Sequence, residues 1–303
     1  MEAKQFSRTA LISACIRAFH SAHDDPKIFD DFLAHRLVSM QECQSLGLYM
    51  PVSLKQAEPP VQGPCPDRAT ALTWWIKVIA GSIIARARYV EDALEQSIRQ
   101  GIKQYVILGA GMDTFAFRRP ELLEQIRVFE IDHPATQALK RRRIEEGGLK
   151  LPDALHFIPH DFVEESLTAA LKRTPYDPKA PTFLSWPGVT YYLSRRDVMN
   201  TFRAIADIAP AGAGIVFDYL DERFFDPENP HQSVHLVLRN VQLTGEPMMT
   251  GFDPGKLASD LACLGFRIRE DLSPDNVERL FLMGRTDCYH AGLYIHFARA
   301  EVV

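Results

Sequence analysis

The chain has 303 residues, of which 46% are hydrophobic, so it can bury a large core in one elaborated domain or in two ordinary ones. Its formal net charge of -5 gives no general electrostatic reason to bind nucleic acid or an anionic membrane. The basic cluster at 140–143 continues a helix-like run, and we interpret it as a solvated helix face. No apolar run reaches membrane length, so we expect neither nucleic acid nor a membrane as a partner.

Five cysteines are scattered along the chain without a C-x-x-C pair: Cys15, Cys43, Cys65, Cys263 and Cys288. An odd count in a chain of this length argues against a disulfide framework and fits a reducing compartment. The short apolar stretch that starts at Ala10 is broken by Arg17, and no small-residue cleavage site follows it. We therefore expect a cytoplasmic protein that is not exported.

The first hundred residues are predicted to be mainly helical. In chain order, the expected elements are a helix over 7–19 capped by Ser7, a helix over 27–38, a proline-rich loop over 51–68, and a helix over 79–98 closed by Gly101. We interpret residues 1–100 as an N-terminal helical lid followed by a lead-in helix.

After Gly101, short apolar runs alternate with helix-like segments. The expected strands cover 105–108, 128–131, 155–158, 182–186, 215–219, 266–270 and 291–298, and the expected helices cover 134–146, 163–173, 195–209 and 254–264. This alternation is typical of an α/β fold with a doubly wound, mostly parallel sheet over residues 101–303. A polar stretch at 221–252, with one helix near 233–241, interrupts the pattern and is predicted to be an insertion that covers the substrate.

A glycine turn follows the first strand of this core. Gly109, Ala110 and Gly111 allow a tight turn and let a ligand approach the backbone without a Cβ in the way. Asp132 ends the next strand 21 positions after Gly111, where a carboxylate can accept hydrogen bonds from a ribose diol. The combination predicts a cofactor that contains adenosine.

Two cofactors fit a glycine turn followed by an acid, namely a nicotinamide dinucleotide and S-adenosylmethionine (SAM). Thr114 occupies the position where a dinucleotide fold usually has Gly or Ala. Asp113 places a negative charge beside the turn, which repels a pyrophosphate but suits the ammonium or sulfonium group of SAM. These departures favour SAM.

The motifs resemble those of the leucine carboxyl methyltransferase family, and more closely its bacterial SAM-dependent O-methyltransferases, which include polyketide carboxyl methyltransferases. The matching strings are "RTAL" (8–11), "ARARYVEDAL" (85–94), "LGAGMDTFAFR" (108–118), "VFEIDHP" (128–134), "HDF" (160–162) and "WPGVTYYL" (186–193). The resemblance runs over nearly the whole chain and implies a class I SAM-dependent methyltransferase fold, with seven strands and an N-terminal helical lid.

The resemblance also implies roles for individual residues. Arg86 would pair with the carboxylate of SAM, Asp132 would bind the ribose, and Asp161 with Phe162 would hold the adenine, while the glycine turn passes beneath the cofactor. Trp186 occupies a tryptophan-like position of the family that is followed by a cofactor-binding glutamate, but here Pro187 follows it. Proline offers no side-chain acceptor, so the contact is lost or comes from a backbone carbonyl or Asp113.

The departure at Pro187 weakens the case for a protein C-terminus as substrate and favours the carboxylate or hydroxyl of a small molecule. A carboxylate needs no general base, whereas a hydroxyl does. Candidate catalytic residues are Tyr192, His133 and His231, with His235 and His290 as further histidines to inspect, and candidate pocket residues are Tyr191, Tyr192, Met248 and Met249. A histidine or tyrosine chosen from sequence is more often a packed or surface residue than a catalytic one, and core filling fits the two methionines at least as well.

His231 and His235 share a helix face, but no acidic third ligand is suitably spaced, so we expect no metal. Three functional classes remain open from the sequence. SAM-dependent O-methylation is the leading one, a nicotinamide-dependent oxidoreductase is the enzymatic alternative, and a SAM-binding protein without catalysis is the third.

Overall fold

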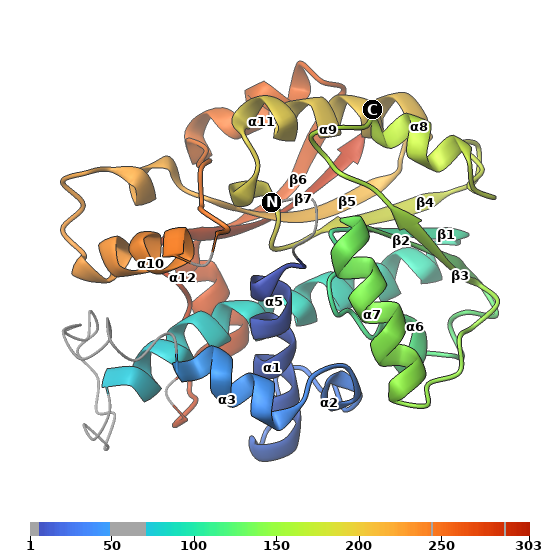
Figure 1. The fold of residues 1–303 in the computed structure, drawn as a ribbon. Helices are drawn as coiled ribbons and strands as arrows, with labels where there is room; N and C mark the ends of the chain where they lie inside the picture. Colours follow the sequence, from blue (N-terminus) through green and yellow to red (C-terminus); the bar gives the residue numbers. More distant parts are fainter. Residues whose placement is uncertain (1–5, 49–70, 244, 288) are drawn as a thin grey trace.

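The computed structural model describes residues 6–48, 71–243, 245–287 and 289–303, and its centre is a seven-stranded sheet (Figure 1). The strands are β1 (Gln104–Leu108), β2 (Arg127–Asp132), β3 (Leu155–Pro159), β4 (Thr182–Trp186), β5 (Gly214–Leu220), β6 (Phe266–Leu272) and β7 (Ile295–Val302). Their spatial order is β3-β2-β1-β4-β5-β7-β6, and β7 pairs antiparallel with both of its neighbours. The predicted doubly wound, mostly parallel sheet is therefore confirmed.

Helices cover both faces of the sheet, as its apolar strands require. The helices of the core are α5 (Ala71–Arg99), α6 (Phe115–Arg118), α7 (Pro134–Glu146), α8 (Leu167–Lys172), α9 (Arg195–Ile208), α10 (Gln232–Leu243), α11 (Pro254–Ala262) and α12 (Pro274–Val277). In Figure 1, α8, α9 and α11 lie above the sheet and α5 lies below it. Each face carries its own hydrophobic cluster, with Phe202 of α9 in one and Leu94 of α5 in the other. All residues of β1 and β4 are buried, as expected for strands covered on both faces.

The N-terminal helices pack beside α7 rather than on the sheet. They are α1 (Arg8–His23), α2 (Ala34–Leu37) and α3 (Met40–Leu48). Leu11 of α1 and Leu37 of α2 share a buried cluster with Leu139 of α7. The predicted cap of α1 is confirmed, since Ser7 accepts a hydrogen bond from the backbone N–H of Ala10.

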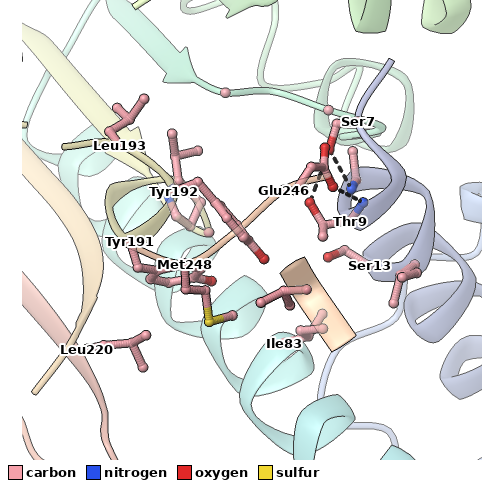
Figure 2. A pocket seen from close by; sticks show the side chains of 18 of the residues that line it. Ser7, Thr9, Ser13, Ile83, Tyr191, Tyr192, Leu193, Leu220, Glu246 and Met248 are labelled. Atoms are coloured by element: carbon pink, nitrogen blue, oxygen red, sulfur yellow. Dashed lines mark hydrogen bonds between the residues drawn. The ribbon is translucent and has the colours of Figure 1, made fainter. Parts of the chain in front are cut away.

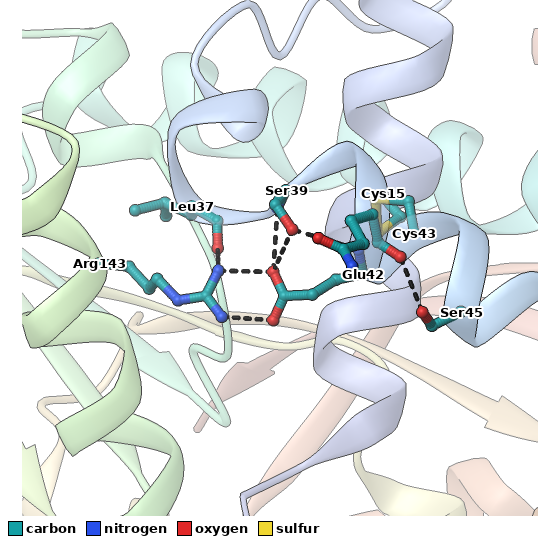
Figure 3. The surroundings of a disulfide bond; sticks show 8 residues. Cys15, Leu37, Ser39, Glu42, Cys43, Ser45 and Arg143 are labelled. Atoms are coloured by element: carbon teal, nitrogen blue, oxygen red, sulfur yellow. Dashed lines mark hydrogen bonds and ion pairs between the residues drawn. A yellow bond between two sulfur atoms is a disulfide. The ribbon is translucent and has the colours of Figure 1, made fainter.

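A disulfide between Cys15 and Cys43 joins α1 to α3 (Figure 3), which corrects the expectation of a chain without a disulfide framework. The two cysteines are 28 residues apart, and they meet because two helices pack side by side, which cysteine spacing does not reveal. Cys263 carries a free, exposed thiol. Cys65, Cys288 and the predicted loop at 51–68 lie outside the described residues.

The basic cluster on α7 is only partly solvated, so the interpretation as a solvated face was wrong for two of its members. Lys140 is buried and donates to Glu130 of β2, with 2.5 Å between Nζ and Oε2. Arg143 makes a two-pronged ion pair with Glu42 of α3, seen in Figure 3, which holds the pKa of Glu42 at about 2. The pairing fastens the N-terminal helices to the core.

Other sequence predictions differ in extent. The helix expected over 27–38 is reduced to the four residues of α2, because bends, a turn and irregular backbone occupy the residues before it. α12 and the π-helical turn Glu278–Leu282, between β6 and β7, were not predicted. Within the described ranges no helix is long and apolar enough to cross a membrane.

Candidate functional site

A cavity of about 630 Å³ opens at the carboxyl ends of the parallel strands, at the switch point between β1 and β4. One side, here called the glycine end, is formed by Gly109 to Asp113, Asp132, His133 and Asp161 to Val163. The other side, the α10 end, is formed by Ile83 of α5, Leu220 of β5, Val234, Val237 and Val241 of α10, Met248 and Tyr294. α1 and the segment 245–249 line the cavity between these two ends.

The glycine turn is close-packed beneath the cavity. Gly109 has a φ of +70°, and a Cβ placed on it would lie 2.3 Å from Cγ2 of Val189. Gly111 has a φ of +51°, and its Cβ would approach that of Ala10 at the start of α1 to 3.1 Å. A side chain at either position would be strained and would press on a residue that lines the cavity, so the turn fits a ligand that approaches bare backbone.

The acidic residues of the glycine end also hold the local backbone. Asp132 accepts from the backbone N–H groups of Gly111 and His133, and burial raises the pKa of its carboxyl. Asp113 accepts from the N–H of Phe115 at 2.7 Å, and Asp161 accepts from the N–H of Val163 at 2.9 Å. Asp132, Asp113 and Asp161 all line the cavity.

Arg86 reaches the cavity from α5 and is fixed by a partner that sequence reasoning missed. Nη1 of Arg86 donates to Asp218 Oδ2 at 2.6 Å and to the Tyr191 hydroxyl at 3.0 Å. The other oxygen of Asp218 accepts from the backbone N–H of Gly188 at 2.6 Å. Burial opposes the charge on Arg86, but Asp218 and Tyr191 together outweigh it and raise the pKa of the guanidinium. A buried aspartate in the apolar strand "GIVFDYL" is a sequence signal that could have found this partner.

A second ion network ties the glycine turn to the N-terminal segment. Arg17 of α1 donates to Asp31 and to the backbone carbonyl of Met112, both at 2.8 Å. Thr114 and Arg118, from the "DTFAFR" string, hold the same Asp31 carboxylate. Burial would raise the pKa of Asp31, but the two arginines hold it below its usual range. The motif therefore positions the N-terminal helices over the turn.

Tyr192 stands between the two ends of the cavity. Figure 2 shows its ring reaching in between Met248 and Ser13. Burial raises the pKa of Tyr192 well above its usual range, so the hydroxyl stays protonated near neutral pH and can donate a hydrogen bond. Close by, Glu246 accepts from the backbone N–H of Thr9 at 2.9 Å, which connects the segment after α10 to the start of α1 (Figure 2).

Several expected site residues lie elsewhere. Trp186 is fully buried in the core against Phe202 and is not among the residues that line the cavity, although its neighbour Pro187 is. His231 packs edge-on to Tyr294, His235 bonds the carbonyl of Asn229, and His290 pairs with Glu278, all outside the described cavity lining.

The other expected residues come together at the cavity. His133 lines it, with Nε2 3.7 Å from Asp161 Oδ2, and so do Arg86, Ala110, Phe162, Tyr191, Met248 and Met249. Among the described residues, no group of three His, Cys, Asp or Glu side chains is placed to hold a metal.

The sheet order and the glycine turn at its switch point define a class I α/β methyltransferase fold. A solved structure, that of a DUF574 family protein from Streptomyces avermitilis, aligns over 99% of both chains with a TM-score of 0.60 and 14% sequence identity. At that identity the likeness supports the fold alone.

Sequence comparison defines the family. The profile of the leucine carboxyl methyltransferase family matches residues 10–206, and the chain belongs to this family. YktD of Bacillus subtilis (strain 168), assigned as a SAM-dependent methyltransferase, is 36% identical in an alignment 312 residues long, gaps included, that covers 99% of both chains. A protein of Mycobacterium tuberculosis (strain H37Rv) with the same assignment is 32% identical over 191 residues, which are 63% of this chain and 51% of that protein. The protein is thus a SAM-dependent methyltransferase, and SAM is its cofactor.

Proposed function

We propose that the protein transfers a methyl group from SAM to an oxygen, either carboxylate or hydroxyl, of a small molecule. The observation that carries the proposal is that one cavity extends from the glycine turn to the apolar α10 end. SAM supplies an electrophilic methyl group on a sulfonium. The acceptor side is enclosed by α10 and the start of α1, which suits a compact molecule better than a protein C-terminus.

In this proposal the glycine end holds SAM. The glycine turn, with Gly109, Ala110 and Gly111, supports the cofactor from below. The polar contacts come from Arg86 toward its carboxylate, Asp113 toward its ammonium, Asp132 toward its ribose, and Asp161 with Phe162 toward its adenine. Asp218 orients Arg86 through the 2.6 Å ion pair, so the guanidinium needs no reorganisation when an anion arrives.

The proposed catalytic contribution of the chain is placement and the exclusion of water. Displacement at the methyl carbon needs the acceptor oxygen in line with the carbon–sulfur bond, so proximity and orientation supply much of the rate. We propose that α1, α2 and α3 provide a helical lid, that α5 is the lead-in helix to the core, and that the 221–252 insertion closes the acceptor side. The Thr9–Glu246 hydrogen bond supports this, since it connects the two segments across the cavity.

Calorimetric titration with S-adenosylhomocysteine tests the cofactor end of the proposal, and detection of methylated products from a panel of carboxylic acids and phenols tests the reaction. We expect tight S-adenosylhomocysteine binding, and a weakening of about 100-fold in R86A, because a buried charged contact to the cofactor is lost. E124Q, a change at an exposed carboxylate, is the control that leaves binding unchanged. Unchanged affinity in R86A would contradict the assigned role of Arg86.

A further inference from the structure

The α10 end of the cavity is apolar over most of its wall. Val234, Val237 and Val241 recur on one face of α10 and line the cavity together with Leu220 and Met248. Four of these five belong to or pack against one hydrophobic cluster that also contains Phe224 and Tyr191. An acceptor that fills this space must bury an apolar body, because polar atoms on it would lose their hydration without a partner.

The charges on the described cavity wall are mostly negative. Five carboxylates line it, namely Asp113, Asp132, Asp161, Asp197 and Glu246, against two arginines, Arg17 and Arg86. Arg17 is paired with Asp31 and Arg86 with Asp218. Burial lowers the pKa of His160, so this lining histidine is neutral near pH 7. Arg86 is moreover the group proposed to meet the carboxylate of SAM.

An anionic acceptor would therefore enter an apolar space in a cavity whose described charges are mostly negative and whose two arginines are already paired. Glu246 lies two residues before Met248 and is the lining carboxylate closest in sequence to the apolar wall. Tyr192 lines the same cavity with a protonated hydroxyl, and Thr9, which donates its backbone N–H to Glu246, lies near both (Figure 2). A donor and a negatively charged acceptor together match the two hydrogen-bonding faces of a hydroxyl group, and they do not match a carboxylate.

We infer that the acceptor is an uncharged hydroxyl compound with an apolar body, held at the α10 end with its hydroxyl between Tyr192 and Glu246. This rests on the proposed function and chooses one of its two acceptor classes. In the transfer, the hydroxyl oxygen bonds to the methyl carbon as the carbon–sulfur bond breaks, the sulfonium becomes a neutral thioether, and the hydroxyl proton passes to the Glu246 carboxylate.

Matched probe pairs on one scaffold test the inference. The protein saturated with S-adenosylhomocysteine is titrated calorimetrically with phenol against benzoate, 2-naphthol against 2-naphthoate, and the corresponding three-ring pair. We expect the hydroxyl member to bind at least about tenfold more tightly in the best-fitting pair, the equivalent of about 1.4 kcal/mol. Three results would overturn the inference if they held in all three pairs. These are equal affinities for the two members, tighter binding of the carboxylate, and no detectable binding of either member.

E246Q separates the charge of Glu246 from its structural contact, since a glutamine oxygen can still accept from the Thr9 N–H. We expect the preference for the hydroxyl member to shrink to a few-fold, and the rate of hydroxyl methylation to fall about 100-fold with little change in KM. If the preference for the hydroxyl member and the methylation rate were both unchanged in E246Q, Glu246 would have no part in the reaction. E124Q is the control. If the wild-type protein did not bind S-adenosylhomocysteine at all, the proposed function would be overturned. Failure of the proposed function and failure of the hydroxyl inference are therefore distinguishable.

Discussion

The two ends of the cavity are built from different kinds of contact. At the glycine end, tight turns and hydrogen bonds from backbone N–H groups fix the position of each carboxylate. At the α10 end, aliphatic side chains from a helix and a loop form an apolar wall that fits a ligand by shape and makes no directional hydrogen bonds. Hydrogen bonds constrain distance and angle, whereas apolar contacts constrain mainly volume. The glycine end can therefore keep one ligand while changes at the α10 end alter the acceptor.

The two ends also differ in how they are anchored. The glycine end follows β1 and β2 in the middle of the sheet, and Asp31 clamps the N-terminal segment onto it. The α10 end lies largely in the 221–252 insertion, which contacts α1 through the Thr9–Glu246 hydrogen bond. A substitution at the first end should weaken cofactor binding, and one at the second should change acceptor use and leave cofactor binding intact.

The largest effect is expected from G109A. A Cβ at Gly109 would lie 2.3 Å from Val189, so we expect S-adenosylhomocysteine affinity to fall at least about 100-fold as the turn is displaced. Gly148 provides a matched control, because its φ of +64° is similar but a Cβ there meets nothing within 4 Å. G148A should cost only the backbone strain, about 1 kcal/mol in the free energy of unfolding. Equal effects of the two variants on affinity would show that strain, not contact, governs the turn.

The buried Glu130–Lys140 pair beneath the glycine end predicts a dependence of stability on pH. Burial raises the pKa of Glu130 to about 7, against the opposing charge of Lys140. The folded protein therefore binds this proton more tightly than the unfolded chain, so the group's contribution to stability falls as pH rises from about 4.5 to about 7 and is constant above that. The contribution is about 3 kcal/mol at most.

A double substitution tests this pH dependence. E130Q/K140M removes both charges, so a lone buried ion is not left behind. Urea unfolding of wild type and double variant across pH 4.5–8 should show the variant gaining stability relative to wild type as pH rises. A constant difference between them would mean that Glu130 is ionised throughout.

A smaller effect is expected from D218N. The asparagine retains an acceptor for the Gly188 N–H but loses the charge that orients Arg86. We expect KM for SAM to rise about tenfold with kcat little changed, because the positioning of the guanidinium acts on binding. E301Q breaks the half-exposed Arg269–Glu301 pair and is the control, with an effect below about 1 kcal/mol on stability. A fall in kcat alone would place Asp218 in the chemical step.

The sequence predicted the parts of the molecule in which local pattern and structure agree. The strands, the Ser7 cap and the glycine turn each depend on neighbouring residues, and they are confirmed, except that the last strand, expected over 291–298, begins at Ile295 and ends at Val302. It did not predict Asp218, Asp31 or the Cys15–Cys43 disulfide, because these depend on which distant segments pack together. Trp186 was placed in the site because it occupies a tryptophan-like position of the family, but its side chain points into the core from the last position of β4.

The smallest effect is expected at the α10 end, from V237A. Removing two methyl groups from this partly buried wall leaves the hydrogen bonds of the cavity intact, so S-adenosylhomocysteine affinity should not change. We expect KM for the best hydroxyl acceptor to rise a few-fold, since about 1 kcal/mol of apolar contact is lost. L280A, which shortens an exposed leucine away from the cavity, is the control. If V237A weakens S-adenosylhomocysteine as much as the acceptor, the two ends are one cooperative unit, and the contrast between a fixed cofactor end and an adaptable acceptor end is wrong.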